Sequence, residues 1–169
     1  MGAQQNAIDQ SSTSVQRHRG MNAMLEALVI ITLVFLILQF LTGIWVNLFV
    51  SFPSTTQAQG FFGVMGAMMS LMQSGGGLLM IHMMMGYLIL FLSIVDLVTS
   101  FITKKAPVIV TSVSGFVSVL FAGINGLLFI FSGFNNNLNS YFMATGFLLA
   151  FMSYFLPCIR SQGHRIASA

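Results

Sequence analysis

Charged side chains are nearly absent from this sequence. Its 169 residues include six Lys or Arg and three Asp or Glu, so charged residues make up 5% of the chain. Soluble domains carry roughly 25%. Hydrophobic residues make up 56%, and so few charges cannot form a water-facing surface around them. The composition excludes an ordinary soluble domain and predicts a protein whose partner is the lipid bilayer.

Several chemistries are excluded by what is missing. The one cysteine, Cys158, excludes an intrachain disulfide and any metal cluster built on several cysteines. No basic run with interleaved aromatic residues is present, so no nucleic-acid partner is predicted. The sequence has no nucleophile–base pair, no paired carboxylates and no metal-ligand spacing. We therefore predict no catalytic residues and no metal site, and we expect that the chain by itself is not an enzyme.

Four continuous apolar segments account for most of the chain. They run from about 24 to 50, 77 to 103, 108 to 132 and 140 to 159. At ~1.5 Å per residue each is long enough to cross ~30 Å of hydrocarbon as a helix. We predict an all-α membrane protein with four transmembrane helices in an up-down bundle over 24–159. Polar tails at 1–23 and 160–169 flank it, and the first is expected to be disordered.

The basic residues predict the orientation of this bundle. Arg17 and Arg19 precede the first segment, Lys104 and Lys105 separate the second from the third, and Arg160 and Arg165 follow the fourth. Four crossings put all six on one side, and basic loops face the cytoplasm. We predict a multi-pass protein of the cell (plasma) membrane with both termini cytoplasmic. The first outer loop is expected to carry a short interfacial helix at about 61–73.

The second apolar segment contains a polar stripe. At ~100° per residue, Asp96 lies about 40° around the helix from His82, and Ser93 falls on the same side. A lipid-facing Asp costs ~3 kcal/mol or more, so this stripe should face the bundle interior. Two polar clusters are expected, one with Asn47 and Asn125 near His82 and one around Asp96. The residues expected to reach Asp96 are Thr111, Ser112, Ser114 and Ser153.

The polar residues leave structural and functional interpretations open. His82 hydrogen-bonds to Asn47 or Asn125, or these residues bind haem or a quinone. Asp96 and Ser93 either form hydrogen bonds with other polar groups of the bundle and fix the helix register, or Asp96 carries protons. We predict no cofactor and disfavour haem b. A transmembrane b haem usually has two axial histidines, only one lies in the membrane here, and the outer loops offer no Lys or Arg to the propionates.

The third and fourth segments carry small residues at helical spacing. Ser114, Ser118, Ala122 and Gly126 recur every four residues, and Gly146 lies in the fourth segment. Such a face lets another helix approach closely. We expect it to pack inside the bundle, with a homo-oligomer contact as the alternative.

Methionines gather before and within the second segment. They are Met65, Met68, Met69, Met72, Met80, Met83, Met84 and Met85. Thioethers favour Cu(I), but Met is also a flexible filler of hydrophobic cores. Because successive residues of a helix point in different directions, we interpret these methionines as packing residues.

Two short motifs carry a resemblance to known proteins. They are GIWVNLFVSFP at 43–53, with His82 and Gly86 following, and NSYFMATGF at 139–147. In these the chain resembles a family of small four-span membrane proteins of bacteria and archaea that carry no assigned function. The resemblance implies the same architecture and no activity. An inward histidine in a four-helix bundle is also similar to b-type cytochromes, from which the chain departs by its single membrane histidine.

The sequence favours a non-catalytic role. Short loops, little soluble mass and small-residue faces are typical of an accessory or structural subunit that associates with other membrane subunits or with itself. One alternative is a haem- or quinone-binding redox subunit that uses His82. A second is a small metal- or proton-linked transporter, although no inverted repeat is evident.

Overall fold

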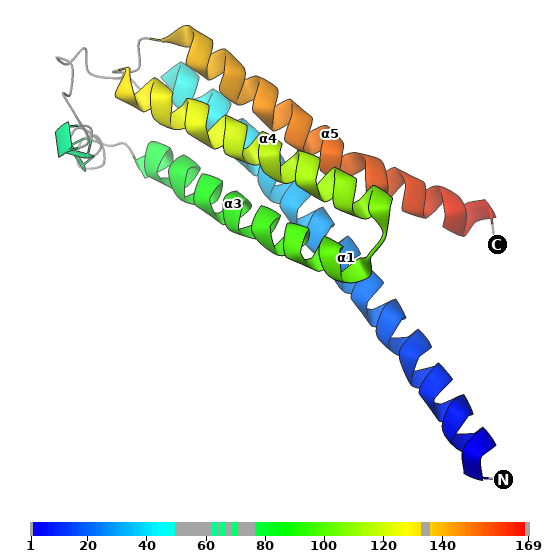
Figure 1. The fold of residues 1–169 in the computed structure, drawn as a ribbon. Helices are drawn as coiled ribbons and strands as arrows, with labels where there is room; N and C mark the ends of the chain where they lie inside the picture. Colours follow the sequence, from blue (N-terminus) through cyan, green and yellow to red (C-terminus); the bar gives the residue numbers. More distant parts are fainter. Residues whose placement is uncertain are drawn as a thin grey trace.

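Four long helices make up the fold (Figure 1). The computed structural model describes residues 2–49, 62–63, 65–66, 69–70, 77–132 and 136–167. The helices are α1 (Gly2–Phe49), α3 (Gly77–Thr103), α4 (Ala106–Phe131) and α5 (Asn137–Ala167). Successive helices run in opposite directions, and the described part of the chain contains no strand. The predicted all-α, up-down bundle is confirmed.

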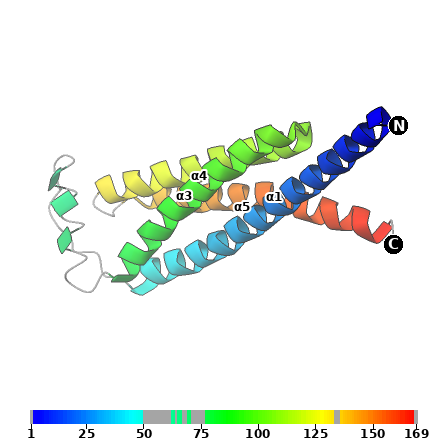
Figure 2. The ribbon, with the colours of Figure 1, turned by 90° about the horizontal axis from the view of Figure 1, so that it is seen from below.

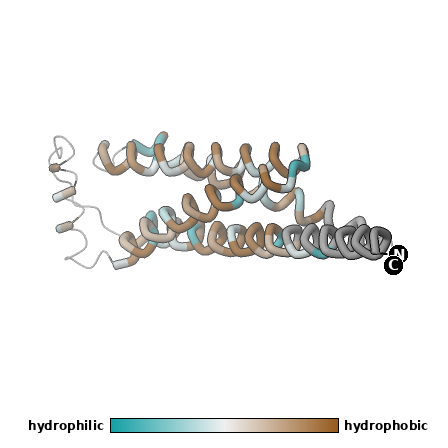
Figure 3. Tube along the Cα trace, turned by 60° about the horizontal axis from the view of Figure 1, so that its bottom comes forward, coloured by the Kyte–Doolittle hydropathy of each residue, from teal (hydrophilic) through white to brown (hydrophobic). Residues whose placement is uncertain are grey.

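Each helix contains a segment that is long and apolar enough to cross a membrane. These segments are Ala23–Phe49, Gly77–Thr103, Ala106–Phe131 and Asn137–Ile159, within three residues of the predicted spans. Large apolar side chains point outward from every helix, with Leu48, Phe91, Val110 and Leu148 all more than half exposed. Apolar residues also run along the length of each span (Figure 3). An exterior of this kind requires lipid rather than water around it.

Helix α1 extends well beyond its membrane segment. It begins at Gly2, so the prediction that residues 1–23 form a disordered tail is wrong for residues 2–23. Continuity with the span explains the difference, because a helix that is already nucleated adds residues without a new nucleation cost.

The turn between α3 and α4 contains two residues. Lys104 has a positive φ of 55°, and the extended Lys105 precedes a helix that carries Pro107 in its first turn. Proline is favoured there because the first helical N–H groups have no intrahelical partner. Such a short connection makes α3 and α4 antiparallel neighbours.

The polar N-terminal part of α1, the α3–α4 turn and the C-terminal part of α5 lie at the same end of the molecule (Figure 1). These segments carry all six Lys and Arg residues, and we call this the basic end. Its cytoplasmic orientation stays a prediction. Most of the predicted interfacial helix at 61–73 lies outside the described residues.

The helices associate as two pairs, α1 with α3 and α4 with α5, and the α4–α5 contact is the more extensive. Figure 2 shows the pairs diverging toward the opposite end, where α1 ends and α3 begins. The expected small-residue packing within the bundle is confirmed. A Cβ atom at Gly146 would lie 2.9 Å from the backbone nitrogen of Ala122, and the hydroxyls of Ser114 and Ser153 are 3.0 Å apart.

All four helices contribute to the hydrophobic core. Its buried residues are Val29, Leu33, Leu36, Ile89, Val119, Ala150 and Tyr154. Because the pairs are closest on the side of the basic end, this core fills the bundle there and leaves room nearer the opposite end.

Candidate binding site

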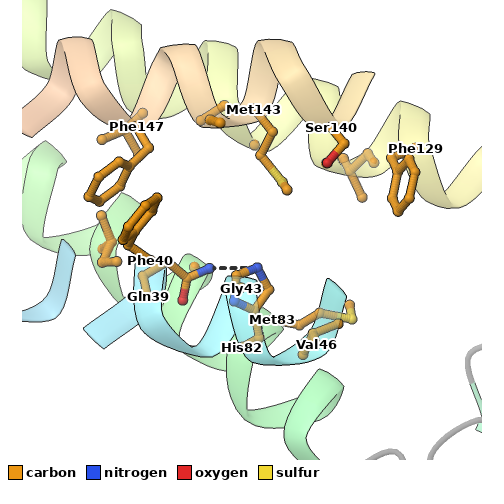
Figure 4. A pocket seen from close by; sticks show the side chains of 18 of the residues that line it. Gln39, Phe40, Gly43, Val46, His82, Met83, Phe129, Ser140, Met143 and Phe147 are labelled. Atoms are coloured by element: carbon orange, nitrogen blue, oxygen red, sulfur yellow. Dashed lines mark hydrogen bonds between the residues drawn. The ribbon is translucent and has the colours of Figure 1, made fainter. Parts of the chain in front are cut away.

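A pocket of about 460 Å³ lies between the two helix pairs. It is lined by residues between 36 and 47 of α1, 79 and 90 of α3, 119 and 130 of α4, and 140 and 150 of α5. Figure 4 shows Gln39, Gly43 and His82 on one wall, with Ser140 and Met143 facing them from α5. The pocket lies where the pairs diverge, and Gly123 and Gly126 of α4 leave additional space among the larger side chains of that helix.

The lining of this pocket is apolar and carries no charge. Among the described lining residues, the polar side chains are those of Gln39, Asn47, His82, Tyr87 and Ser140. At the basic-end side it is bounded by core residues and by Phe40 and Phe147, whose rings stack with centroids 4.8 Å apart. The volume falls within the ~300–1,000 Å³ that small-molecule sites commonly have.

The imidazole of His82 connects α3 to α1 through both ring nitrogens. Nδ1 lies 3.1 Å from Thr42 Oγ1, and Nε2 lies 3.2 Å from Gln39 Nε2. Gly43 makes this approach possible, since a Cβ atom there would lie 2.9 Å from His82 Cε1. A glycine is required where a ring lies this close to a helix backbone.

The directions of these hydrogen bonds can be assigned by counting hydrogens. The Thr42 hydroxyl donates its one hydrogen to Gln39 O at 3.0 Å, so it can only accept from His82 Nδ1–H. Nε2 of His82 then accepts from the Gln39 amide. With this tautomer and this amide orientation, which are assigned from the network, the histidine is neutral.

The predicted partners of His82 are wrong. Its contacts are with Gln39 and Thr42, whereas Asn125 is buried and donates to Phe121 O at 2.8 Å. Asn47 lines the pocket but its side chain is exposed. The register of α1 against α3 causes the difference, because it brings the face of Gln39 and Gly43 to the level of His82.

Asp96 lies deeper, toward the basic end, and is completely buried together with Ser93. The inward orientation predicted for these two residues is confirmed. The partners predicted for Asp96 are wrong, however, because Oδ2 contacts Thr32 Oγ1 of α1 at 3.0 Å. Ser114 and Ser153 bond to each other, and Thr111 donates to carbonyls of its own helix.

Sequence analysis missed Thr32, Gln39 and Thr42, although a signal for them exists. Together with Asn47 they are the only polar side chains between residues 27 and 49. Thr32 and Gln39 are seven residues apart, which places them on one helix face. The polar residues of α1 therefore form a stripe that complements the stripe of α3.

This geometry limits metal and haem chemistry. In the described segments, no three His, Cys, Asp or Glu side chains form a group able to hold a metal ion. Axial ligation of haem iron by His82 would require the loss of its contact with Gln39 or with Thr42. His82 is thus positioned as part of a polar wall of the pocket.

The fold and the site define a polytopic α-helical membrane protein with an apolar pocket inside the bundle. Comparisons of the chain with models of protein families, with curated proteins and with solved structures found no match. The function is therefore argued from the site.

Proposed function

We propose that this protein is a non-catalytic membrane protein that binds an uncharged, largely apolar molecule with one hydrogen-bonding end, of the quinone class. One observation carries the proposal. A pocket of about 460 Å³, lined by all four helices, has an apolar interior and a wall formed by Gln39 and His82. Pockets with this combination of apolar lining and a few polar groups are typical of small-molecule sites.

The absence of charge from the lining limits the ligand. No Lys, Arg, Asp or Glu is among the lining residues. A carboxylate or phosphate placed there would lose its hydration without gaining an ionic partner, which is costly in an apolar environment. Uncharged ligands avoid this cost, so fatty acids and phospholipid headgroups fit less well than a quinone.

The polar wall offers a ligand a hydrogen-bond donor and an acceptor, because Gln39 Oε1 is buried without a partner in the described structure. The Gln39 amide nitrogen carries two hydrogens, of which one is donated to His82 Nε2. The second is available to a ligand, and a quinone carbonyl is a suitable acceptor. The remainder of such a ligand would contact Phe40, Met143 and Phe147, which offer flat and polarisable surfaces.

The single tryptophan supplies a direct test, because Trp45 lies on α1 between the lining residues Ile44 and Val46. Quinones quench indole fluorescence at short range. Titration of the purified protein with decylubiquinone in mild detergent should quench Trp45 saturably, and oleate should not compete. Quenching that rises linearly with quinone, as partition into micelles gives, would contradict the proposal.

Two leucine substitutions make this test specific. No atom lies within 4 Å of a Cβ placed at Gly123, and Gly123 lines the pocket, so the side chain of Gly123→Leu should occupy pocket space. Gly77→Leu is the matched control, because a Cβ there is also unobstructed and Gly77 does not line the pocket. We expect Gly123→Leu to weaken saturable quenching at least tenfold and Gly77→Leu to leave it unchanged. Equal quenching in the two variants would contradict binding in this pocket.

The subunit role predicted from the sequence is compatible with ligand binding. The pocket lies inside the bundle, whereas association with other chains would use the apolar outer faces. Whether the bound molecule is reduced, transferred or only held depends on those partners, and we propose the binding alone.

A further inference from the structure

A second polar site lies in the bundle, separate from the pocket. The hydroxyl of Thr32 on α1 is 3.0 Å from Leu28 O of its own helix and also 3.0 Å from Asp96 Oδ2 of α3. Asp96 is absent from the lining of the pocket. The lining ends on α1 at Leu36, four residues from Thr32, and on α3 at Leu90, six residues before Asp96.

Hydrogen counting decides the state of this carboxyl group. A threonine hydroxyl has one hydrogen, so two short contacts to acceptors cannot both be ordinary hydrogen bonds. If Thr32 donates to Leu28 O, the contact with Asp96 requires a hydrogen on Oδ2. A neutral Asp96 supplies it, and both contacts are then satisfied.

The surroundings of Asp96 offer little to an ionised carboxylate. Its side chain has no exposed surface, and within the described structure Oδ1 has no hydrogen-bond partner. Among the side chains that the structure describes, no basic residue contacts it. The ionisable side chains around it are Tyr154 and Cys158 of α5, with Glu26 of α1 near Cys158, while Ala106–Phe131 of α4 has none. An ion buried with one neutral partner is poorly solvated, which favours the acid.

Tyr154 completes the site. Its hydroxyl is buried without a hydrogen-bond partner in the described structure and lies close enough to Asp96 to interact with it electrostatically. The Asp96 oxygen Oδ1, which carries no hydrogen in the neutral acid, needs a donor. The Tyr154 hydroxyl carries a hydrogen and borders this site together with Ser93, so it is the candidate donor.

We propose that Asp96 is a proton-binding site inside the membrane. The acid holds its proton on Oδ2 and donates it to Thr32. On release the O–H bond breaks, the electron pair stays on Oδ2 and the proton goes to water. The Thr32 hydroxyl then turns from Leu28 O to the carboxylate. Thr32 is thus a positioning residue that stabilises both states.

Buried hydroxyls lie between this site and the basic end of the bundle. Ser100 is fully buried one turn beyond Asp96, and Thr103 donates to Ser100 O at 2.7 Å next to the α3–α4 turn. Toward the opposite end the apolar core intervenes. We therefore expect protons to reach Asp96 from the basic end.

Infrared spectroscopy tests this assignment directly, because the chain has only three Asp and Glu residues, Asp9, Glu26 and Asp96. The folded protein at neutral pH should show the carbonyl band of a protonated carboxylic acid. Raising the pH should convert this band reversibly into carboxylate bands while the protein stays monodisperse. Asp96→Asn should abolish the band.

Two threonine variants provide the matched pair. Thr32→Val removes the acceptor of the acid proton and should shift the carbonyl band. Thr42→Val is the same substitution on the same helix, but its hydroxyl contacts His82, so the band should stay in place.

Four outcomes would overturn the proposal. They are no acid band in the folded protein at neutral pH, a band that survives in Asp96→Asn, an acid that never titrates, and carboxylate bands that shift on adding Na⁺. The last would identify a cation site instead. None of these readouts involves the quinone, so failure here is distinguishable from failure of the proposed ligand binding.

Discussion

The ring of Tyr154 lies directly against the backbone of Gly115, where a Cβ atom would come within 2.5 Å of the ring carbon Cζ. This contact packs α5 against α4 and aligns the buried end of Tyr154 with Asp96. Gly115→Ala should therefore force the ring or the helices apart and lower the free energy of unfolding by about 1–3 kcal/mol, as overpacked cores do. Denaturation in mixed micelles followed by circular dichroism measures this change.

Gly123→Ala is the control for that prediction. It lies on the same helix, and nothing is within 4 Å of the added Cβ. Stability should be unchanged or slightly raised, because Ala favours a helix more than Gly does. Equal losses in the two variants would mean that any change in α4 destabilises the bundle.

Gly43→Ala should displace His82. The added methyl group would lie 2.9 Å from Cε1, so the imidazole must lose at least one contact with α1. We expect a loss of about 1–3 kcal/mol in stability, as for a buried polar group without its partner, and weaker quenching of Trp45 by decylubiquinone. Gly77→Ala is the control: nothing lies within 4 Å of a Cβ there and Gly77 does not line the pocket, so neither quantity should change.

A charged substitution at Asp96 should lower expression and stability more than an apolar one. Asp96→Leu replaces the acid with an apolar residue in a fully buried place, and Thr32 keeps its bond to Leu28 O. Asp96→Lys places an ammonium group there, and a membrane-embedded lysine costs ~2.5–3.5 kcal/mol on insertion scales. We expect better expression and stability from the leucine variant. The reverse order would show that an ion is accommodated at this site.

Orientation is testable by cysteine labelling in a Cys158→Ser background. Lys105→Cys lies in the α3–α4 turn at the basic end, and Asn136→Cys lies at the start of α5 at the opposite end; both side chains are exposed. An impermeant maleimide added to intact cells should label position 136 and not position 105. Labelling of position 105 would contradict the cytoplasmic orientation of the basic end.

Association with other chains is the remaining prediction. The outer faces of all four helices are apolar, and the described segments include no soluble domain. Purification in mild detergent should return a particle clearly heavier than the 18.4 kDa chain with its micelle. A monodisperse monomer without other proteins would count against the subunit role while leaving the pocket and Asp96 proposals unaffected.

The four spans and the inward face of α3 follow from the properties of single segments. Continuous apolar runs fix the helices, because a backbone in lipid must satisfy its hydrogen bonds within each segment. The cost of exposing Asp96 to lipid fixes the inward face of α3. The helical spans and the inward face of α3 each depend on one segment and the lipid around it, and not on the neighbouring helices.

Which polar residues contact each other depends on how the helices pack together. Asn47 and Asn125 were expected at His82 because they lie at a similar depth, yet Gln39 and Thr42 make the contacts, and Thr32 rather than a residue of α4 or α5 contacts Asp96. Depth follows from position along a helix, but partners depend on how each helix is rotated and how closely it approaches. Here Gly43 and the pairing of α1 with α3 determine the rotation of α1 and its close approach to α3. The divergence of the two helix pairs leaves the pocket between them.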